Sequence, residues 1–347
     1  MPLARLQRWK PASLPKLPPL PGGLRLWITL VSLGFVLAAL LAHGRQLLQL
    51  SLDGQGWLWL LLGVGVSLLS LVANGLAWGV ILRWFGLRPR WEALVSLYLA
   101  TNLRKYLPGN IWHLASRVQA LRAGPPAAPL AGPLTTPMAL LVTLLDPLLA
   151  AVVALVLMAL GGWRNGFELA GLLPLLLLLP RWLNPLLRRL ERSRARSLGL
   201  ERELEREALG QAAEAPVRGY PWPPLLAQLV FVLLRFAGFA CCVWAFDLQL
   251  STDWLLWLAG FCLAWTAGLV VPGAPGGLGV FEAVLLLRLG QAIPESSLLA
   301  VALSYRLIVT LADLLAAGLV ALDGRLARAW PEAAAVQAKP AAPGSGT

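Results

Sequence analysis

Two adjacent cations, Arg104 and Lys105, interrupt an apolar stretch of the chain, where a charge is costly unless it binds something. The apolar run Leu94–Leu103 precedes them, and Pro108-Gly109 breaks the chain shortly after them. About 11 helical residues at about 1.5 Å each reach roughly half of a ~30 Å hydrocarbon core, so the cations would lie near the bilayer midplane. A helix that restarts after the break offers free N–H groups and a positive dipole end, which suit a phosphate. We therefore predict a broken, re-entrant helix that holds an anion site inside the membrane.

The residues around this break form the candidate binding site for a lipid headgroup. The set is Arg104, Lys105, Tyr106, Pro108, Gly109, Asn110, Trp112, His113 and Arg117. The alternative is that the two cations end a short helix and extend to the membrane interface, as long basic side chains often do.

A second Pro/Gly break lies in the other half of the chain. Its residues are Pro272, Gly273, Pro275, Gly276, Gly277, Gly279 and Glu282. Each break follows a full span and an apolar half-helix, restarts as a helix, and precedes another long span. The first break opens from the cytoplasm, and the second opens from outside if it is re-entrant; a stretched crossing is the alternative. Such a pair indicates an inverted repeat with a site near the midplane, although residue identity between the halves is weak.

Further ionisable residues lie inside apolar spans, namely Asp146, Arg235, Glu282, Arg306 and Asp313. One charge facing lipid at the centre of a span costs about 2.5–3.5 kcal/mol, so these five with Arg104 and Lys105 would cost about 20 kcal/mol, more than a typical folding stability. We therefore expect them to face inward and to have partners. Arg306, Thr310 and Asp313 share one face of the last span. Four basic groups against three acidic ones leave room for an anionic ligand, and structural ion pairing alone is the alternative.

The composition is that of a multi-pass helical membrane protein. Apolar residues make up 58% of the 347 positions and charged residues 13%. We expect one transmembrane domain at 24–322, with a cytoplasmic charged loop at 181–219, between disordered tails at 1–23 and 323–347. Lys and Arg outnumber Asp and Glu by 29 to 17, mostly in loops, which indicates topology control and anionic lipid headgroups rather than nucleic acid.

The apolar runs predict an all-α bundle of about six full spans plus the two broken segments. The expected full spans are Leu24–Ala42, Trp57–Leu82, Pro137–Leu160, Phe167–Leu179, Pro224–Phe246 and Ser296–Leu322. The second broken segment consists of Trp254–Val271, the break and Ala283–Leu289. Basic residues before the first span and after the second place the N-terminus in the cytoplasm, and the C-terminus follows it there.

Metal and cofactor chemistry finds little support in the residue types. The three cysteines and two histidines have no metal-ligand spacing, and neither a phosphate-binding nucleotide loop nor a paired-carboxylate motif is present. We expect no metal, no cofactor and no catalytic residues, and we favour a protein that is not an enzyme.

The two breaks also carry a family resemblance. K-Y-L-P-G-N-I-W at 105–112 and P-G-A-P-G-G-L-G-V-F-E at 272–282 resemble motifs of the lysylphosphatidylglycerol synthase transmembrane (flippase-like) family. The resemblance covers most of residues 24–322 and implies a bacterial inner-membrane protein of the lipid-translocating kind. Its signature residues here are Lys105, Tyr106, Pro108, Gly109, Trp112, Pro272, Gly276, Gly277, Gly279 and Glu282. The synthases carry a soluble aminoacyl-transfer domain after the membrane part. This chain ends soon after its last span, so we expect a stand-alone membrane domain without lysyl transfer.

Three functions remain open at this point. The first is a translocase that moves an anionic lipid, an aminoacylated phospholipid or a polyprenyl phosphate between leaflets, with Glu282 and Arg306 gating or coupling the movement. The second is a membrane-embedded transferase that acts on a lipid-linked substrate, and the third is an assembly factor that transports nothing. The expected partners are membrane phospholipids or polyprenyl-phosphate lipids. A second copy of the chain and an enzyme of lipid synthesis are further candidates.

Overall fold

The computed structural model describes residues 52–106, 111–123, 129–161, 167–198, 200, 202, 219–248, 254–271 and 277–329. Both expected tails, the expected span Leu24–Ala42, and several residues of the two breaks lie wholly or partly outside these ranges. In the described part of the chain, all regular structure is helical apart from one isolated bridge between Pro89 and Leu130.

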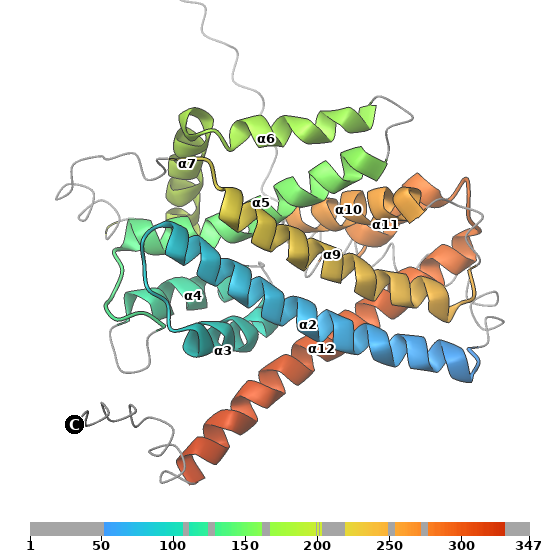
Figure 1. Cartoon of the computed structure of the whole chain (residues 1–347), viewed down its shortest axis with the longest axis horizontal. Coiled ribbons are helices and arrows are strands. Elements are labelled where there is room, and N and C mark those ends of the chain that lie inside the picture. The colour runs from blue at the N-terminus through green and yellow to red at the C-terminus, as the bar shows by residue number, and fades with distance from the viewer. Residues whose placement is uncertain are drawn as a thin grey trace, which may run out of the picture.

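Four described helices are long and apolar enough to cross a membrane. They are α2 (Gly54–Trp84), α5 (Thr136–Gly161), α9 (Trp222–Ala245) and α12 (Glu295–Ala329), which match four of the expected spans (Figure 1). Helix α12 continues beyond Leu322, where the sequence predicts a tail. The prediction of an all-α, multi-pass membrane protein is confirmed.

Helices α2 and α9 pack antiparallel along small residues. A Cβ atom added to Gly238 would lie 2.8 Å from Ser67 Oγ, and one added to Gly56 would lie 2.6 Å from the Ala245 carbonyl oxygen. In lipid, apolar surface gives no driving force between helices, so close backbone approach and dispersion contacts must hold them together. Glycine at these positions therefore permits the central helix pair of the fold.

The helix directions define two ends of the molecule. We call the end where α2 stops the arginine-rich end, because Arg83, Arg88 and Arg90 lie there. Helices α5 and α9 begin at the same end: Trp78 Nε1 donates to the Val142 carbonyl at 3.1 Å, and Gln228 Nε2 donates to Asp146 Oδ1 at 2.7 Å. We call the other the opposite end.

The first hairpin consists of α3 (Trp91–Asn102), the 3₁₀ turn η1 (Leu103–Tyr106) and α4 (Trp112–Arg122). Its beginning and its exit meet, because the Arg90 N–H donates to the Pro129 carbonyl at 2.8 Å beside the Pro89–Leu130 bridge. The segment therefore starts and finishes at the arginine-rich end, as the sequence predicts for a re-entrant helix.

The second hairpin consists of α10 (Trp254–Val270) and α11 (Val280–Leu289). Helix α10 starts beside the end of α5, since a Cβ on Gly161 would lie 2.3 Å from the Leu255 carbonyl oxygen. Helix α11 returns along α10, and Leu289 packs on Gly260 near the start of α10. Of the two alternatives left open by the sequence, this course is the re-entrant one, and it starts from the opposite end.

The two halves of the described chain have the same element order in opposite directions. The first half is α2, the first hairpin and α5, and the second is α9, the second hairpin and α12 (Figure 1). Helix α12 begins at the opposite end and crosses α2, with Ala312 and Ala316 packed against Leu71. This is the arrangement that an inverted repeat requires.

The return from α5 to α9 differs from the prediction. In place of a straight span over Phe167–Leu179, the chain forms the 3₁₀ helix η3 (Phe167–Leu172) and the short α6 (Leu173–Leu177), and then bends by 82° into α7 (Pro180–Leu198). Pro180, the first residue of α7, lacks the N–H that a continuous helix needs, which explains the break. If the bent pair counts as one span, the described residues contain up to five.

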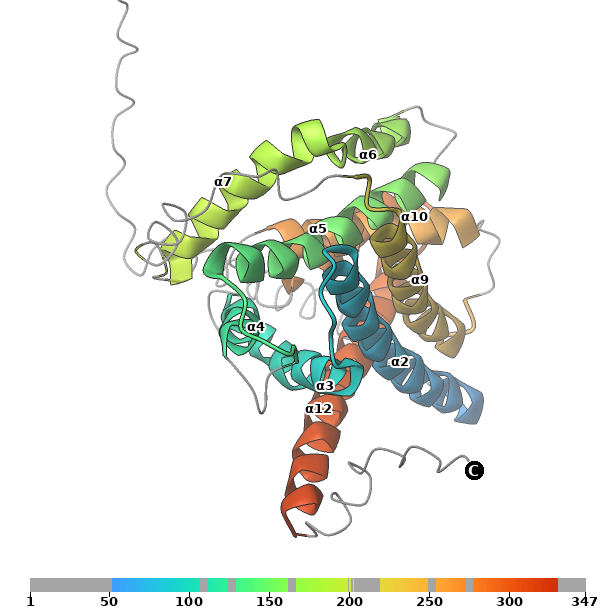
Figure 2. The same ribbon diagram turned by 60° about the vertical axis from the view of Figure 1, so that its left-hand side comes forward.

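Helix α7 is the described part of the predicted charged loop. Its Leu183, Leu187 and Ala195 are buried, while Arg188 and Arg192 are exposed. Figure 2 shows α6 and α7 passing over α5, on the side away from α2 and α12. The E-R-E-L-E-R-E run, for which the sequence predicts a surface helix, lies almost wholly outside the described residues.

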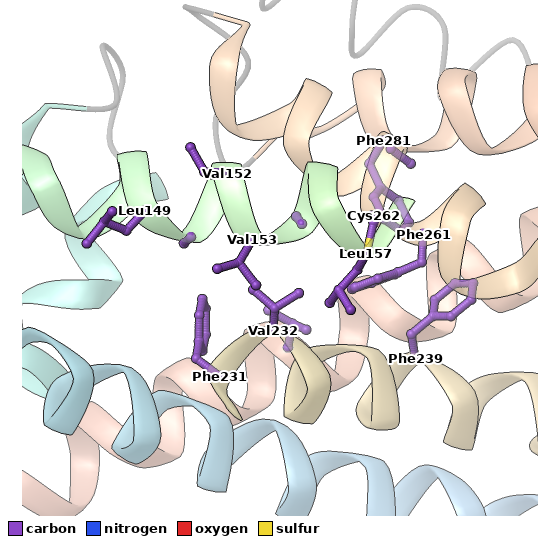
Figure 3. Close-up of a cluster of buried hydrophobic side chains, with 14 of the residues drawn as sticks. Leu149, Val152, Val153, Leu157, Phe231, Val232, Phe239, Phe261, Cys262 and Phe281 are labelled. Atoms are coloured by element: carbon purple, nitrogen blue, oxygen red, sulfur yellow. The ribbon is translucent and has the colours of Figure 1, made fainter. Parts of the chain in front are cut away.

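An apolar and aromatic core fixes the second hairpin in place. Phe239 of α9, Phe261 of α10, Phe281 of α11 and Tyr305 of α12 pack together with ring centroids 5.0–6.2 Å apart. Figure 3 shows how side chains of α5, among them Val153 and Leu157, face Val232 and the other side chains of α9.

We expect the two hairpins to be accessible from opposite sides of the membrane. The three native cysteines are buried, so we expect a maleimide to label only a cysteine that is introduced at an exposed position. Arg88→Cys and Ala123→Cys should react with a membrane-impermeant maleimide from one side, and Gln291→Cys from the other. Labelling of Arg88→Cys and Ala123→Cys from different sides would show that the first hairpin crosses the membrane.

Candidate functional site

The tip of the first hairpin is fastened to α12 through Asp313. This carboxylate is 1% exposed and accepts from Lys105 Nζ at 2.7 Å, from the Tyr106 hydroxyl at 2.6 Å and from Asn102 Nδ2 at 2.7 Å. We call this group the first anchor. Charge-assisted hydrogen bonds of this kind are stronger than neutral ones, and here they hold η1 at the point where the helix is broken.

The tip of the second hairpin is fastened to α12 through Arg306. Its Nε donates to Glu282 Oε1 at 2.8 Å and its Nη2 to the Gly277 carbonyl at 2.6 Å, while Glu282 Oε2 accepts from the Gly279 N–H at 2.7 Å. We call this group the second anchor. Glu282 thus caps its own helix and neutralises an arginine of the neighbouring one.

Glycine is required at the tip of the second hairpin. Gly277 and Gly279 have φ values of +73° and +80°, which side chains rarely tolerate. A Cβ on Gly277 would also lie 2.8 Å from the Cα of Gly268 in α10. The tip can therefore pack against α10 and present its backbone to Arg306 only without a side chain.

Both anchors lie on one face of α12, as the sequence predicts. Arg306 and Asp313 are seven residues apart, or about 10.5 Å along the helix axis. Thr310, between them, lies 3.5 Å from the Tyr106 hydroxyl. One helix therefore carries the contacts that hold both hairpin tips.

A third buried charge pair links the first hairpin to α5. Asp146 accepts from Gln228 Nε2 at 2.7 Å and from the Tyr98 hydroxyl at 3.2 Å, and its Oδ2 lies 3.6 Å from Arg117 Nη1. Arg117 is 2% exposed, its Cζ lies 3.6 Å from the centroid of the Tyr98 ring, and its Nε donates to Thr101 Oγ1 at 3.2 Å.

A cavity of about 160 Å³ lies between these three groups. Its charged and imidazole side chains come from the first hairpin and three spans, and they are Lys105, His113, Arg117, Asp146, Arg235 and Arg306. Its apolar wall includes Phe231, Trp265 and Phe281. The side chains of Lys105 and Arg306 are 17% and 22% exposed, so both are within reach of a molecule outside the protein. The cavity is a basic, partly apolar chamber.

The cavity lies halfway along the spans. Asp146 and Arg235 are near the middle of α5 and α9, and Arg306 lies about a third of the way along α12. This placement agrees with a site at mid-depth of the membrane.

The structure separates the two cations with which the sequence argument begins. Lys105 lines the cavity, but Arg104 is exposed and donates to Ser116. A 3₁₀ turn has about three residues per turn, so neighbouring side chains point about 120° apart and cannot share one site. The placement of Arg104 in the interior is therefore wrong.

The other predicted headgroup residues divide in the same way. Tyr106, His113 and Arg117 line the cavity, whereas Trp112 does not and is 50% exposed. Gly277, Gly279 and Glu282 form the second anchor. Pro108, Gly109, Asn110, Pro272, Gly273, Pro275 and Gly276 lie outside the described residues.

Sequence reasoning missed the uncharged polar residues of the cavity, among them Asn74, Tyr98 and Asn102. Asn74 bonds the Tyr98 hydroxyl and accepts from Gln228, which connects α2, α3 and α9. Polar groups without partners in a membrane cost several kcal/mol, so a lone Asn or Gln inside an apolar span is the signal that could have found them.

The described part of the chain brings together no group of three or more His, Cys, Asp or Glu side chains that could hold a metal ion. The fold and the cavity define a multi-pass helical membrane protein with two opposed re-entrant hairpins around a basic chamber. The chain belongs to the lysylphosphatidylglycerol synthase TM region family, whose model matches residues 25–317. It is therefore a membrane protein related to lipid modification or translocation. A comparison with curated proteins finds no match.

The first anchor generates a stability prediction. Asp313→Leu should lower the free energy of unfolding by about 3–5 kcal/mol, because it leaves the Lys105 ammonium buried without its carboxylate. Adding Lys105→Met should restore a large part of that loss, since two apolar side chains of similar volume replace the pair. Denaturant unfolding in detergent micelles of the unaltered protein, the two single variants and the double variant measures the coupling free energy between the two residues. Losses that simply add would contradict the anchor.

Proposed function

We propose that the protein moves a lipid with an anionic headgroup between the two leaflets, through the cavity between the hairpins. One observation carries this proposal: two hairpins start from opposite ends of the molecule and are fastened to the same helix beside one basic cavity. Such an arrangement gives each leaflet its own gate to a shared site.

The cavity supplies what a headgroup loses on leaving water. A phosphate in hydrocarbon would have no hydrogen-bond donors, whereas the cavity offers the ammonium of Lys105 and the guanidinium of Arg306. The apolar wall that includes Phe231 and Phe281 can contact the first carbons of the lipid, while the acyl chains stay in the bilayer. The headgroup then crosses the membrane in a polar environment.

Exchange of partners at the anchors would open the gates. A lipid phosphate offers Lys105 or Arg306 the same kind of charge-assisted contact that Asp313 or Glu282 provides. Exchange of one anion for the other keeps the cation paired, and it breaks the ion pair that holds one hairpin tip to α12. The hairpin that is released decides which leaflet the cavity faces, and the lipid gradient or a coupled ion sets the direction.

The arginine-rich end is assigned to the cytoplasm by the positive-inside rule. Arg83, Arg88 and Arg90 follow α2 there, and Arg122 ends the first hairpin at the same end. In this orientation the first hairpin opens from the cytoplasm and the second from outside. We place the protein in the bacterial inner membrane, with its described C-terminal helix ending on the cytoplasmic side.

Adjacent residues provide a matched test of the cavity. Lys105→Gln should slow lipid movement at least about tenfold, because the headgroup loses a cation and Asp313 loses its partner. Arg104→Gln should leave the rate unchanged, since that side chain is exposed outside the cavity. The assay uses purified protein in liposomes, with a fluorescent phospholipid quenched from one side. Equal changes in the rate of lipid movement for the two variants would contradict the proposal that the lipid passes through the cavity.

Glu282→Gln tests the second anchor separately. The amide can still cap Gly279 but no longer neutralises Arg306, so Arg306 should hold the lipid phosphate more tightly and release it more slowly. We expect slower lipid movement in the same liposome assay, together with a lower dissociation constant for the lipid in equilibrium binding. Unchanged kinetics would argue against an exchange at this anchor, and formation of a new lipid product by the pure protein would favour a transferase.

A further inference from the structure

We propose that Arg235 is the phosphate-binding residue of the cavity, and that the site takes one singly charged anion, the phosphodiester of a phospholipid without an amino group. The identity of the ligand as a lipid rests on the proposed function. The position and the charge of the site rest on the contacts of Arg235 itself.

Arg235 is a buried cation for which no ion pair within 4 Å is found among the described residues, although the Asp313 carboxylate is near enough to attract it. Its side chain lines the cavity at the middle of α9 and the residue is 6% exposed. Its Nε and Nη1 atoms are buried and have no hydrogen-bond partner, and the contact that it does make is with the Phe231 ring, whose centroid lies 5.7 Å from Cζ. An arginine stays protonated in a protein, and one ring face offsets only a small part of the cost of taking a cation out of water. The residue is therefore placed to bind an anion that enters the cavity.

The charges around the cavity fix how much charge that anion carries. The three buried carboxylates each have a cationic partner: Asp313 pairs with Lys105, Glu282 with Arg306, and Asp146 with Arg117. Arg235 is the fourth cation, so the described interior has one positive charge more than its carboxylates balance. One negative charge on the ligand neutralises it.

This balance separates the lipid classes that the sequence leaves open. A phosphodiester carries one negative charge, whereas a phosphate monoester such as a polyprenyl phosphate carries about 1.5 to 2 at pH 7. An aminoacylated or zwitterionic headgroup brings a cation of its own, so its net charge would leave the surplus positive charge of the interior unbalanced. The site therefore suits a simple anionic phosphodiester best.

The shape of the site agrees with such a headgroup. A guanidinium can donate two parallel hydrogen bonds to the two terminal oxygens of a phosphodiester. The cavity volume of about 160 Å³ is roughly ten times the ~15 Å³ that one water requires. Phe231 and Trp265 pack edge to face beside Arg235 and provide an apolar wall for the glycerol carbons.

Equilibrium binding to the full chain in detergent tests the proposal with four probes. Dihexanoylphosphatidylglycerol is the singly charged diester, and dihexanoylphosphatidic acid and dihexanoylphosphatidylcholine are the monoester and the zwitterion. Glycerophosphoglycerol is the diester headgroup without acyl chains. We expect dissociation constants at least about tenfold lower for the first probe than for each of the other three.

The matched variants are Arg235→Gln and Arg83→Gln. Both arginines lie over an aromatic ring, but Arg83 is exposed at the end of α2 and does not line the cavity. Arg235→Gln should weaken binding of dihexanoylphosphatidylglycerol at least about tenfold, and Arg83→Gln should not change it. Equal binding by Arg235→Gln and the unaltered protein overturns the site.

A stability measurement separates a binding role from a structural one. Without lipid, Arg235→Met should raise the midpoint of thermal unfolding by a few degrees, because it removes an uncompensated buried charge. A lowered midpoint shows that Arg235 stabilises the fold, which overturns the proposal. Dihexanoylphosphatidylglycerol should raise the midpoint of the unaltered protein and leave that of Arg235→Met unchanged.

The remaining outcomes identify which part fails. Tighter binding of the monoester than of the diester overturns the single-charge assignment, and equal binding of glycerophosphoglycerol overturns the lipid as the source of the phosphate. If the expected binding pattern is found but purified protein moves no lipid in liposomes, the Arg235 site stands and the proposed function falls.

Discussion

The ion pairs between α12 and the two hairpin tips are the interactions on which the rest of this structure depends. A helix that is broken inside a membrane exposes backbone groups that lipid cannot satisfy, so the break must be held against protein. Lys105 with Asp313 and Glu282 with Arg306 hold η1 and the start of α11 against one helix. The desolvation cost of these buried charges is offset only because each carboxylate also accepts further hydrogen bonds. Asp313 accepts them from Tyr106 and Asn102, and Glu282 accepts one from Gly279.

Apolar packing and polar contacts have separate tasks in this fold. Small residues bring α2 and α9 together, and the rings of Phe239, Phe261 and Phe281 fix the second hairpin against α9. Packing of Phe281 on Tyr305 also positions the second tip against α12, but dispersion contacts lack the directional specificity of ion pairs along the helix axis. The charged groups supply that specificity, since a shift of a few ångströms along the axis would separate them.

The sequence alone predicts the spans α2, α5, α9 and α12, both breaks, and the shared face of Arg306 and Asp313, because these features depend on local periodicity and composition. It does not predict that Lys105 points inward while Arg104 points outward. That difference depends on the register of the 3₁₀ turn η1, because a shift of one residue would change which side chain points inward. It also fails at Pro180, where a straight span was expected and the chain bends. The partners of Arg117 and Gln228 come from distant helices, and no local pattern carries that information.

The distance between the two anchors restricts how the proposed cycle can proceed. Arg306 and Asp313 are about 10.5 Å apart along the axis of a single helix, or about two turns, so each hairpin tip has its own attachment point on α12. A single phosphate can therefore replace one carboxylate at a time, and the other anchor keeps its hairpin closed. Arg235 belongs to α9 rather than to either hairpin or to α12, so it can retain the phosphate while the contact on either side changes. In the proposed cycle, alternating access uses two separate anchors and one fixed cation.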